Sequence, residues 1–180
     1  MNYFELFEVP VSFFPDLAEI RKKYHQLSFK FHPDFHSVGS AYTENEVLEK
    51  STEINEAYQT LLDHDKLLSY ILDLYNALPQ EGQAKVPQDF LLDMMDINES
   101  LMELELDFDP ERYKQVLNAL EMLEKELLAA IQPVLETYPN SPNPAADLRA
   151  VLEFFLKKRY LLRIRENLSK FAPQAGMAEW

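Results

Sequence analysis

The 180-residue chain contains no cysteine, only three glycines and no apolar run that approaches the length of a membrane span. Without cysteine it has no disulfide bond, no thiolate metal ligand and no cysteine nucleophile. A membrane-spanning helix needs about 20 consecutive apolar residues, so we expect no membrane insertion. The scarcity of glycine, the eleven prolines and an apolar fraction of 47% indicate long helices separated by proline-marked breaks. The sequence therefore predicts an all-α protein.

Positive charge is also scarce, because 17 Lys and Arg face 31 Asp and Glu and leave a net charge of −14. This charge repels nucleic acid and anionic membranes, so we expect neither as a partner. The charges are unevenly distributed: residues 88–108 are acidic and contain no Lys or Arg, whereas residues 157–170 are mostly basic. An acidic helix beside a basic one is favourable in a bundle, although each exposed pair contributes little.

The first long pattern is an amphipathic helix over residues 16–31, with Asp16 and Glu19 as a capping pair after Pro15. Apolar side chains recur there in steps of three and four and form one stripe, namely Leu17, Ile20, Tyr24, Leu27 and Phe31. The other side of the helix is basic and carries Arg21, Lys22, Lys23 and Lys30. Such a basic face is often only solvated surface, but in so acidic a chain we expect it to bind a partner.

The tripeptide His32-Pro33-Asp34 ends this helix, because a proline forces the preceding residue out of the α-helical region. It lacks the parts of an active site, since no Ser lies near a base and no Gly-rich phosphate loop follows. An enzyme or metal site that uses His25, His32, Asp34 and His36 is disfavoured, because Pro33 disrupts the helical spacing of His32 and His36. We expect the tripeptide to present the His and Asp side chains rigidly to a binding partner. An ordinary turn is the remaining alternative.

The next helix begins at the capping box of Thr43 and Glu46 and keeps the same apolar spacing, so it should pack antiparallel to the first. About the first 75 residues resemble the J-domain family of co-chaperones. The resemblance rests on a helix that ends in His-Pro-Asp, followed by a loop and then by the segment 54–61 (INEAYQTL). The family usually has Lys or Arg after the Asp, where this chain has Phe35. The resemblance implies binding to the ATPase of a DnaK-type chaperone through His32, Pro33, Asp34, Arg21, Lys22, Lys23 and Lys30.

A polar connector over residues 76–87 separates this predicted J-domain (residues 1–75) from three further helices at 88–108, 110–137 and 144–171. Pro87 and Pro110 suit first-turn positions, and Pro133 should kink or shorten the second helix. Each helix has one clear apolar stripe, so residues 88–180 are predicted to form an antiparallel three-helix bundle.

Apolar side chains remain on the helix at 88–108 after its core stripe is assigned. They are mixed with acids, which is typical of a protein-docking surface; widening of the core, or covering of the first module, is the open alternative. The residues concerned are Leu91, Leu92, Met95 and Met102, with Asp96, Glu99 and Glu103 among them, and Tyr160 on the third helix is expected to reach the same face.

A J-like module followed by an acidic-faced bundle is similar to the HscB/Jac-type co-chaperones of iron–sulfur cluster biogenesis. The resemblance implies no enzyme activity and no cofactor, an HscA-type chaperone as one partner and an IscU-type scaffold protein as the other. Its scaffold-contact positions fall on Leu91, Leu92, Met95, Asp96, Glu99, Glu103 and Tyr160. A general J-domain co-chaperone with a different client is the alternative. Because no presequence is visible, we expect a bacterial cytoplasm, although mature mitochondrial chains lose theirs.

Overall fold

The computed structural model describes residues 1–32, 34, 42–80 and 85–176, and all regular secondary structure in these ranges is helical. The all-α prediction is confirmed. The chain forms two compact units, which comprise Met1–Ala77 with Leu135–Pro144, and Leu78–Val134 with Ala145–Trp180. Among the described residues, no helix combines the length and apolar character that a membrane crossing requires.

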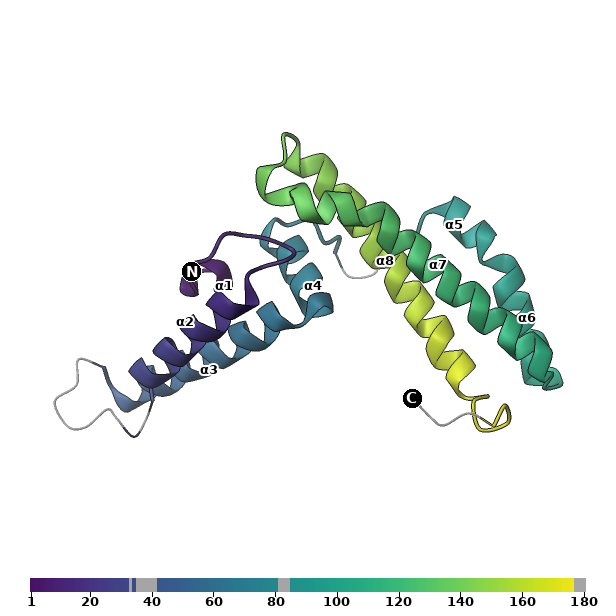
Figure 1. The fold of residues 1–180 in the computed structure, drawn as a ribbon, viewed down its shortest axis with the longest axis horizontal. Helices are drawn as coiled ribbons and strands as arrows, with labels where there is room; N and C mark the ends of the chain where they lie inside the picture. Colours follow the sequence, from purple (N-terminus) through teal and green to yellow (C-terminus); the bar gives the residue numbers. More distant parts are fainter. Residues whose placement is uncertain (33, 35–41, 81–84, 177–180) are drawn as a thin grey trace. The chain divides into compact units, whose positions relative to one another are not determined.

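The first unit contains the helices α1 (Tyr3–Leu6), α2 (Leu17–Lys30), α3 (Glu44–Leu62) and α4 (His64–Leu74), as Figure 1 shows. The predicted caps are present: the Asp16 carboxylate accepts hydrogen bonds from the first turn of α2, and Thr43 forms its capping box at α3. The core of this unit comes from every helix and includes Phe4, Phe7, Ile20, Ile54, Leu61, Leu68 and Ile71. One stripe position was wrong, since Leu17 on the first turn of α2 remains 41% exposed.

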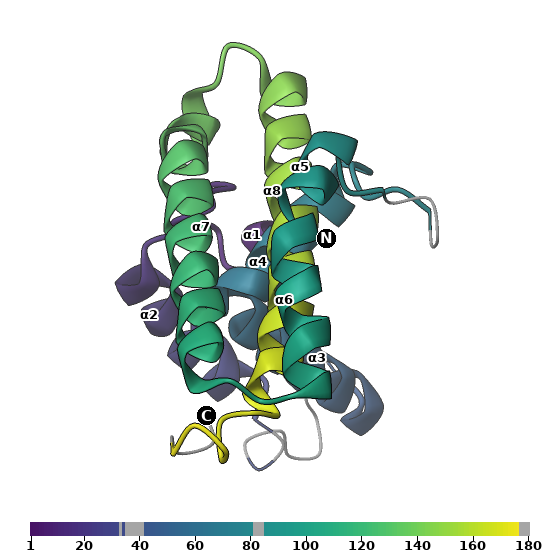
Figure 2. The ribbon, with the colours of Figure 1, turned by 90° about the vertical axis from the view of Figure 1, so that its right-hand side faces the viewer.

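The second unit contains α5 (Gln88–Asp93), α6 (Met95–Leu106) and most of α7 (Pro110–Thr137) and α8 (Pro144–Ser169). Helices α6, α7 and α8 run side by side along their lengths (Figure 2). The three predicted stripes meet in one core that includes Phe90, Met94, Leu104, Tyr113, Leu120, Leu161 and Leu168. Pro133 does not shorten α7, which continues to Thr137; the 3-10 turn η2 (Tyr138–Asn140) follows it.

The helix predicted as one piece over 88–108 is in fact two, because Met94 ends α5 and precedes α6. The carbonyl oxygen of Met94 accepts from the backbone N–H of Asn98 at 3.0 Å and from the side-chain amide of the same residue at 3.0 Å. Bonding of a polar side chain to the carbonyl four residues earlier often accompanies a bend in a helix. Neither glycine nor proline marks the position, so the break carried no ordinary sequence signal.

Candidate docking surfaces

The His32–Asp34 pair lies directly after α2. Phe31 closes the helix by donating its backbone N–H to the Leu27 carbonyl at 2.9 Å, and its ring is buried. The backbone N–H of Asp34 donates to Nδ1 of His32 at 3.2 Å, while a carboxylate oxygen of Asp34 lies 4.0 Å from the same atom. Pro33 lies outside the described residues.

Both side chains of this pair are exposed, 47% for His32 and 84% for Asp34. The arrangement therefore presents an imidazole ring and a carboxylate on a short stretch of backbone that follows the buried Phe31 ring. Within the described ranges, no three His, Asp or Glu side chains gather closely enough to hold a metal ion.

The direction of α2 is fixed by aromatic and polar contacts with α3. The Tyr24 hydroxyl donates to the Asn55 side-chain oxygen at 2.9 Å, and the rings of Tyr24 and Tyr58 stack with centroids 3.9 Å apart. Ile54 and Ala57, from the same motif, are buried. The segment 54–61 thus positions the helix that carries the polar pair, a structural role that the motif alone did not reveal.

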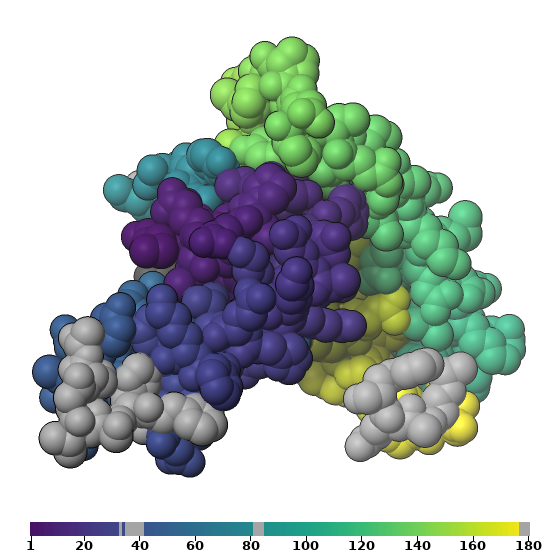
Figure 3. Space-filling model, turned by 60° about the vertical axis from the view of Figure 1, so that its left-hand side comes forward, coloured from purple at the N-terminus to yellow at the C-terminus, as the bar shows by residue number. Residues whose placement is uncertain are grey.

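The basic face of α2 is divided by the structure. Arg21 and Lys22 are exposed and form no ion pair with any described residue, whereas half-buried Lys23 forms a hydrogen-bonded ion pair with Glu8. The bond and the charge of Lys23 lower the pKa of the Glu8 carboxyl. The Lys30 ammonium lies 5.3 Å from the centroid of the Phe31 ring. Figure 3 turns the surface of α1 and α2, in purple and indigo, toward the viewer.

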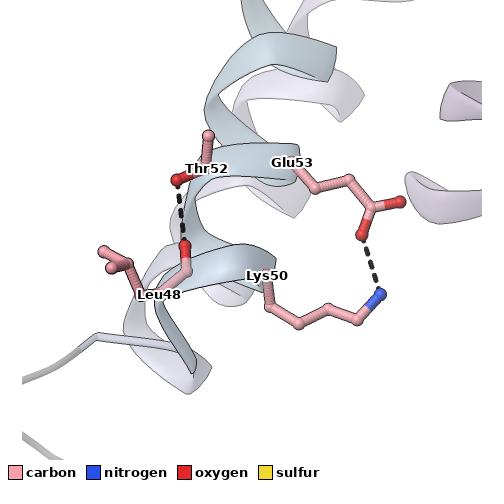
Figure 4. A network of polar contacts seen from close by, with 4 residues as sticks. All are labelled: Leu48, Lys50, Thr52 and Glu53. Carbon is pink, nitrogen blue, oxygen red and sulfur yellow. Dashed lines mark hydrogen bonds and ion pairs between the residues drawn. The ribbon is translucent and has the colours of Figure 1, made fainter. Parts of the chain in front are cut away.

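Helix α3 adds no uncompensated cation beside this face. Its single lysine, Lys50, forms an ion pair with Glu53 at 2.7 Å, one helical turn later (Figure 4). Close by, the Thr52 hydroxyl donates to the Leu48 carbonyl at 2.9 Å. Among the lysines and arginines of α2 and α3, Arg21 and Lys22 are therefore exposed cations that form no ion pair with a described residue.

The second surface lies on the outer side of α5 and α6. Its three predicted apolar contacts are exposed: Leu91 and Leu92 before the Met94 break and Met95 after it. Exposure decides against the alternative that these side chains widen the core. The predicted acids Asp96, Glu99 and Glu103 are exposed as well, and Glu103 forms an ion pair with Arg112 of α7 at 3.1 Å.

Tyr160 differs from the other predicted residues because it is half-buried and packs against the bundle core. Its ring meets the Phe90 ring edge-on at 5.7 Å, and its hydroxyl accepts a hydrogen bond from the Asn98 amide at 2.8 Å. The Lys157 ammonium lies 5.6 Å from the centroid of the same Phe90 ring. Asn98 was absent from the sequence-based predictions, since a lone Asn on a helix carries no distinctive pattern.

Comparisons with known proteins also match two separate parts of the chain to two different domain families. A DnaJ domain matches residues 2–70, and an HSCB C-terminal oligomerisation domain matches residues 86–169. The "Co-chaperone protein HscB homolog" of Pseudoalteromonas atlantica is 33% identical over 95% of this chain and 100% of its own. The human "Iron-sulfur cluster co-chaperone protein HscB" is 31% identical over 93% of this chain and 67% of its own. The crystal structure of the human protein superimposes with a TM-score of 0.69 at 27% identity, over 96% of this chain and 83% of that one.

Proposed function

The chain belongs to the HscB co-chaperone family, and from this membership we propose a co-chaperone of iron–sulfur cluster biogenesis. In this role the protein stimulates ATP hydrolysis by a DnaK/HscA-type chaperone and delivers an IscU-type scaffold protein to it. Any ATPase chemistry belongs to the chaperone, and this chain performs no catalytic step.

The observation that carries the proposal is the presence of two exposed surfaces of opposite character. One combines Arg21 and Lys22 with the His32–Asp34 pair, and the other combines apolar side chains with the acids of α5 and α6. Surfaces of opposite charge select different partners, because like charges placed together cost several kcal/mol. A chain that binds two proteins through separate faces is an adaptor.

The chaperone surface works through complementary charge and a fixed polar pair. Arg21 and Lys22 attract an acidic face of the ATPase domain and speed encounter. His32 and Asp34 then bond to groups that the chaperone exposes only in one nucleotide state, so that binding favours the state that hydrolyses ATP. Lys23 and Lys30 support this surface, Lys23 through its ion pair with Glu8. The sequence places Pro33, with its rigid ring, between these two residues.

The scaffold surface binds through Leu91, Leu92, Met95 and the ring of Tyr160, with Asp96, Glu99 and Glu103 as its charged rim. Methionine and leucine suit this task because flexible apolar side chains adapt to a partner. Simultaneous binding places the scaffold near the chaperone's substrate site, and the two contacts act together as a coupling free energy.

We place this function in the bacterial cytoplasm. The absence of cysteine and the similarity to bacterial relatives support this compartment. The mitochondrial matrix is the alternative, since the human relative has a similar identity.

Single-turnover ATP hydrolysis by an HscA-type chaperone tests the proposal. The reaction is run with the chaperone alone, with this protein, with an IscU-type scaffold, and with both together. We expect stimulation by this protein and a further increase with the scaffold that exceeds the sum of the two separate effects. Stimulation that ignores the scaffold would indicate a general J-domain co-chaperone with another client. No stimulation of any DnaK-type chaperone would overturn the proposal.

A further inference from the structure

Helix α6 carries two apolar stripes on opposite sides. Ile97, Leu101 and Leu104 pack into or against the bundle core. Met95, Met102 and Leu106 are exposed instead, at 60%, 66% and 88%. At about 100° per residue, positions 95, 99, 102 and 106 fall within a sector of roughly 60°, so these side chains and Glu99 form one continuous outer stripe.

The outer stripe is longer than the scaffold surface described above. Met95 to Leu106 spans eleven steps of the helix, or roughly 16 Å at 1.5 Å per residue. Met102 and Leu106 extend it beyond the predicted contacts, toward the end of α6. Leu106 is the most exposed large apolar side chain among the described residues. A row of exposed apolar side chains is unfavourable in water, and a partner that covers the row relieves this free-energy cost.

The rim of the stripe is acidic on both sides. At the same angular spacing, Asp96 and Glu103 lie along one edge and Glu105 along the other. Residues 88–108 contain no Lys or Arg, so the segment supplies no cation of its own to neutralise this rim. Arg112 of α7 pairs with Glu103 and compensates one edge only.

We propose that Met102 and Leu106 belong to the scaffold-binding surface and select a scaffold with an apolar strip bordered by basic side chains. This inference rests on the proposed function and extends it along the whole of α6. The same rim argues against a second copy of this chain as the occupant, because pairing α6 against α6 would bring the two acidic rims together.

The test measures binding of an IscU-type scaffold protein by isothermal titration calorimetry to the full chain and its variants. Met102→Gln and Leu106→Gln remove the apolar contact with a side chain that keeps good helix propensity. Met122→Gln on α7 and Leu162→Gln on α8 are matched controls, since these side chains are 63% and 51% exposed but lie outside α6. Leu92→Gln reports on the scaffold surface that the proposed function already uses.

We expect Met102→Gln and Leu106→Gln each to raise the dissociation constant about tenfold, while both controls stay within about twofold of the unaltered chain. Affinity should also fall as salt rises from about 50 to about 300 mM, because the acidic rim is screened. Weakening by Leu92→Gln alone would overturn this inference and leave the proposed function standing. No binding by the unaltered chain would overturn both, and self-association that Leu106→Gln abolishes would assign the stripe to a second copy instead.

Discussion

The side-chain amide of Asn98 donates one hydrogen bond to the Tyr160 hydroxyl, at 2.8 Å, and another to the Met94 carbonyl, at 3.0 Å. One amide group therefore connects α8 to the break between α5 and α6. Leu92 lies before this break and Met95 after it, so the angle at Met94 sets how the two halves of the proposed scaffold surface are presented. Pre-organised surfaces bind more tightly because less conformational freedom is lost in the complex.

We expect Tyr160→Phe to weaken scaffold binding about threefold to tenfold, since it removes one hydrogen bond with a net value of about 0.5–1.5 kcal/mol. Isothermal titration calorimetry provides the measurement, and stimulation of the chaperone in the absence of scaffold should stay unchanged. Tyr75→Phe is the matched control, because Tyr75 lies in the first unit and its hydroxyl makes no hydrogen bond to a described residue. Equal affinities for Tyr160→Phe and the unaltered chain would contradict this role.

Periodicity was sufficient to predict the elements that bury one clear face. The caps at Asp16 and Thr43 and the extent of α7 follow from local chemistry that acts within a few residues, and the structure confirms them. The core stripes of the second unit were predictable for the same reason, since each stripe buries its side chains whatever the neighbouring helix contributes.

What sequence could not provide were the contacts between distant residues. The bond from the Asn98 side chain to the Met94 carbonyl accompanies the helix break, and the anchoring of Tyr160 depends on a partner 62 positions away in the chain. The division of the basic face has the same origin, because Glu8 and Lys23 meet only once α2 is folded against the N-terminal segment. A spacing rule treats Lys22 and Lys23 alike, whereas the fold separates them.

His32→Gln should abolish stimulation of the chaperone ATPase while leaving the thermal unfolding midpoint nearly unchanged, because the His32 side chain is about half exposed. His25→Gln is the control for loss of an exposed histidine, here on the helix α2 that precedes His32, and it should retain stimulation. Single-turnover ATP hydrolysis measures both variants. Retained stimulation by His32→Gln would remove the polar pair from the proposed mechanism.

Lys22→Gln should affect mainly association with the chaperone, whereas Lys23→Gln should affect mainly the stability of the fold. Loss of exposed Lys22 is expected to slow association with the chaperone, more at about 50 mM salt than at about 300 mM, because its charge acts through long-range attraction. Loss of Lys23 breaks the pair with Glu8, so it should lower the free energy of unfolding slightly, because exposed ion pairs contribute little, and change association little. Stopped-flow association and urea unfolding provide the two measurements. Equal slowing by both substitutions would show that the ion pair does not divide the face.

Asp63 joins α3 to α4, and its carboxylate accepts hydrogen bonds from the backbone N–H groups of Asp65 and Lys66, each at 3.0 Å. These bonds, first that from Lys66, lower the pKa of Asp63 below its ordinary value of 3.8. A carboxyl with a depressed pKa stabilises the fold above that ordinary value, and the contribution disappears as the pH falls through the lower folded value. Asp63→Ala should therefore cost about 1 kcal/mol at neutral pH, the typical cost of losing an N-cap. The difference from the unaltered chain should shrink as the pH falls below the ordinary carboxyl value. Urea unfolding across this range measures the difference, and Asp73→Ala, which removes an exposed carboxyl from the same helix without removing a cap, should show no such loss. A difference that stays constant down to the lowest pH would show that the ionised carboxylate does not carry the stabilisation.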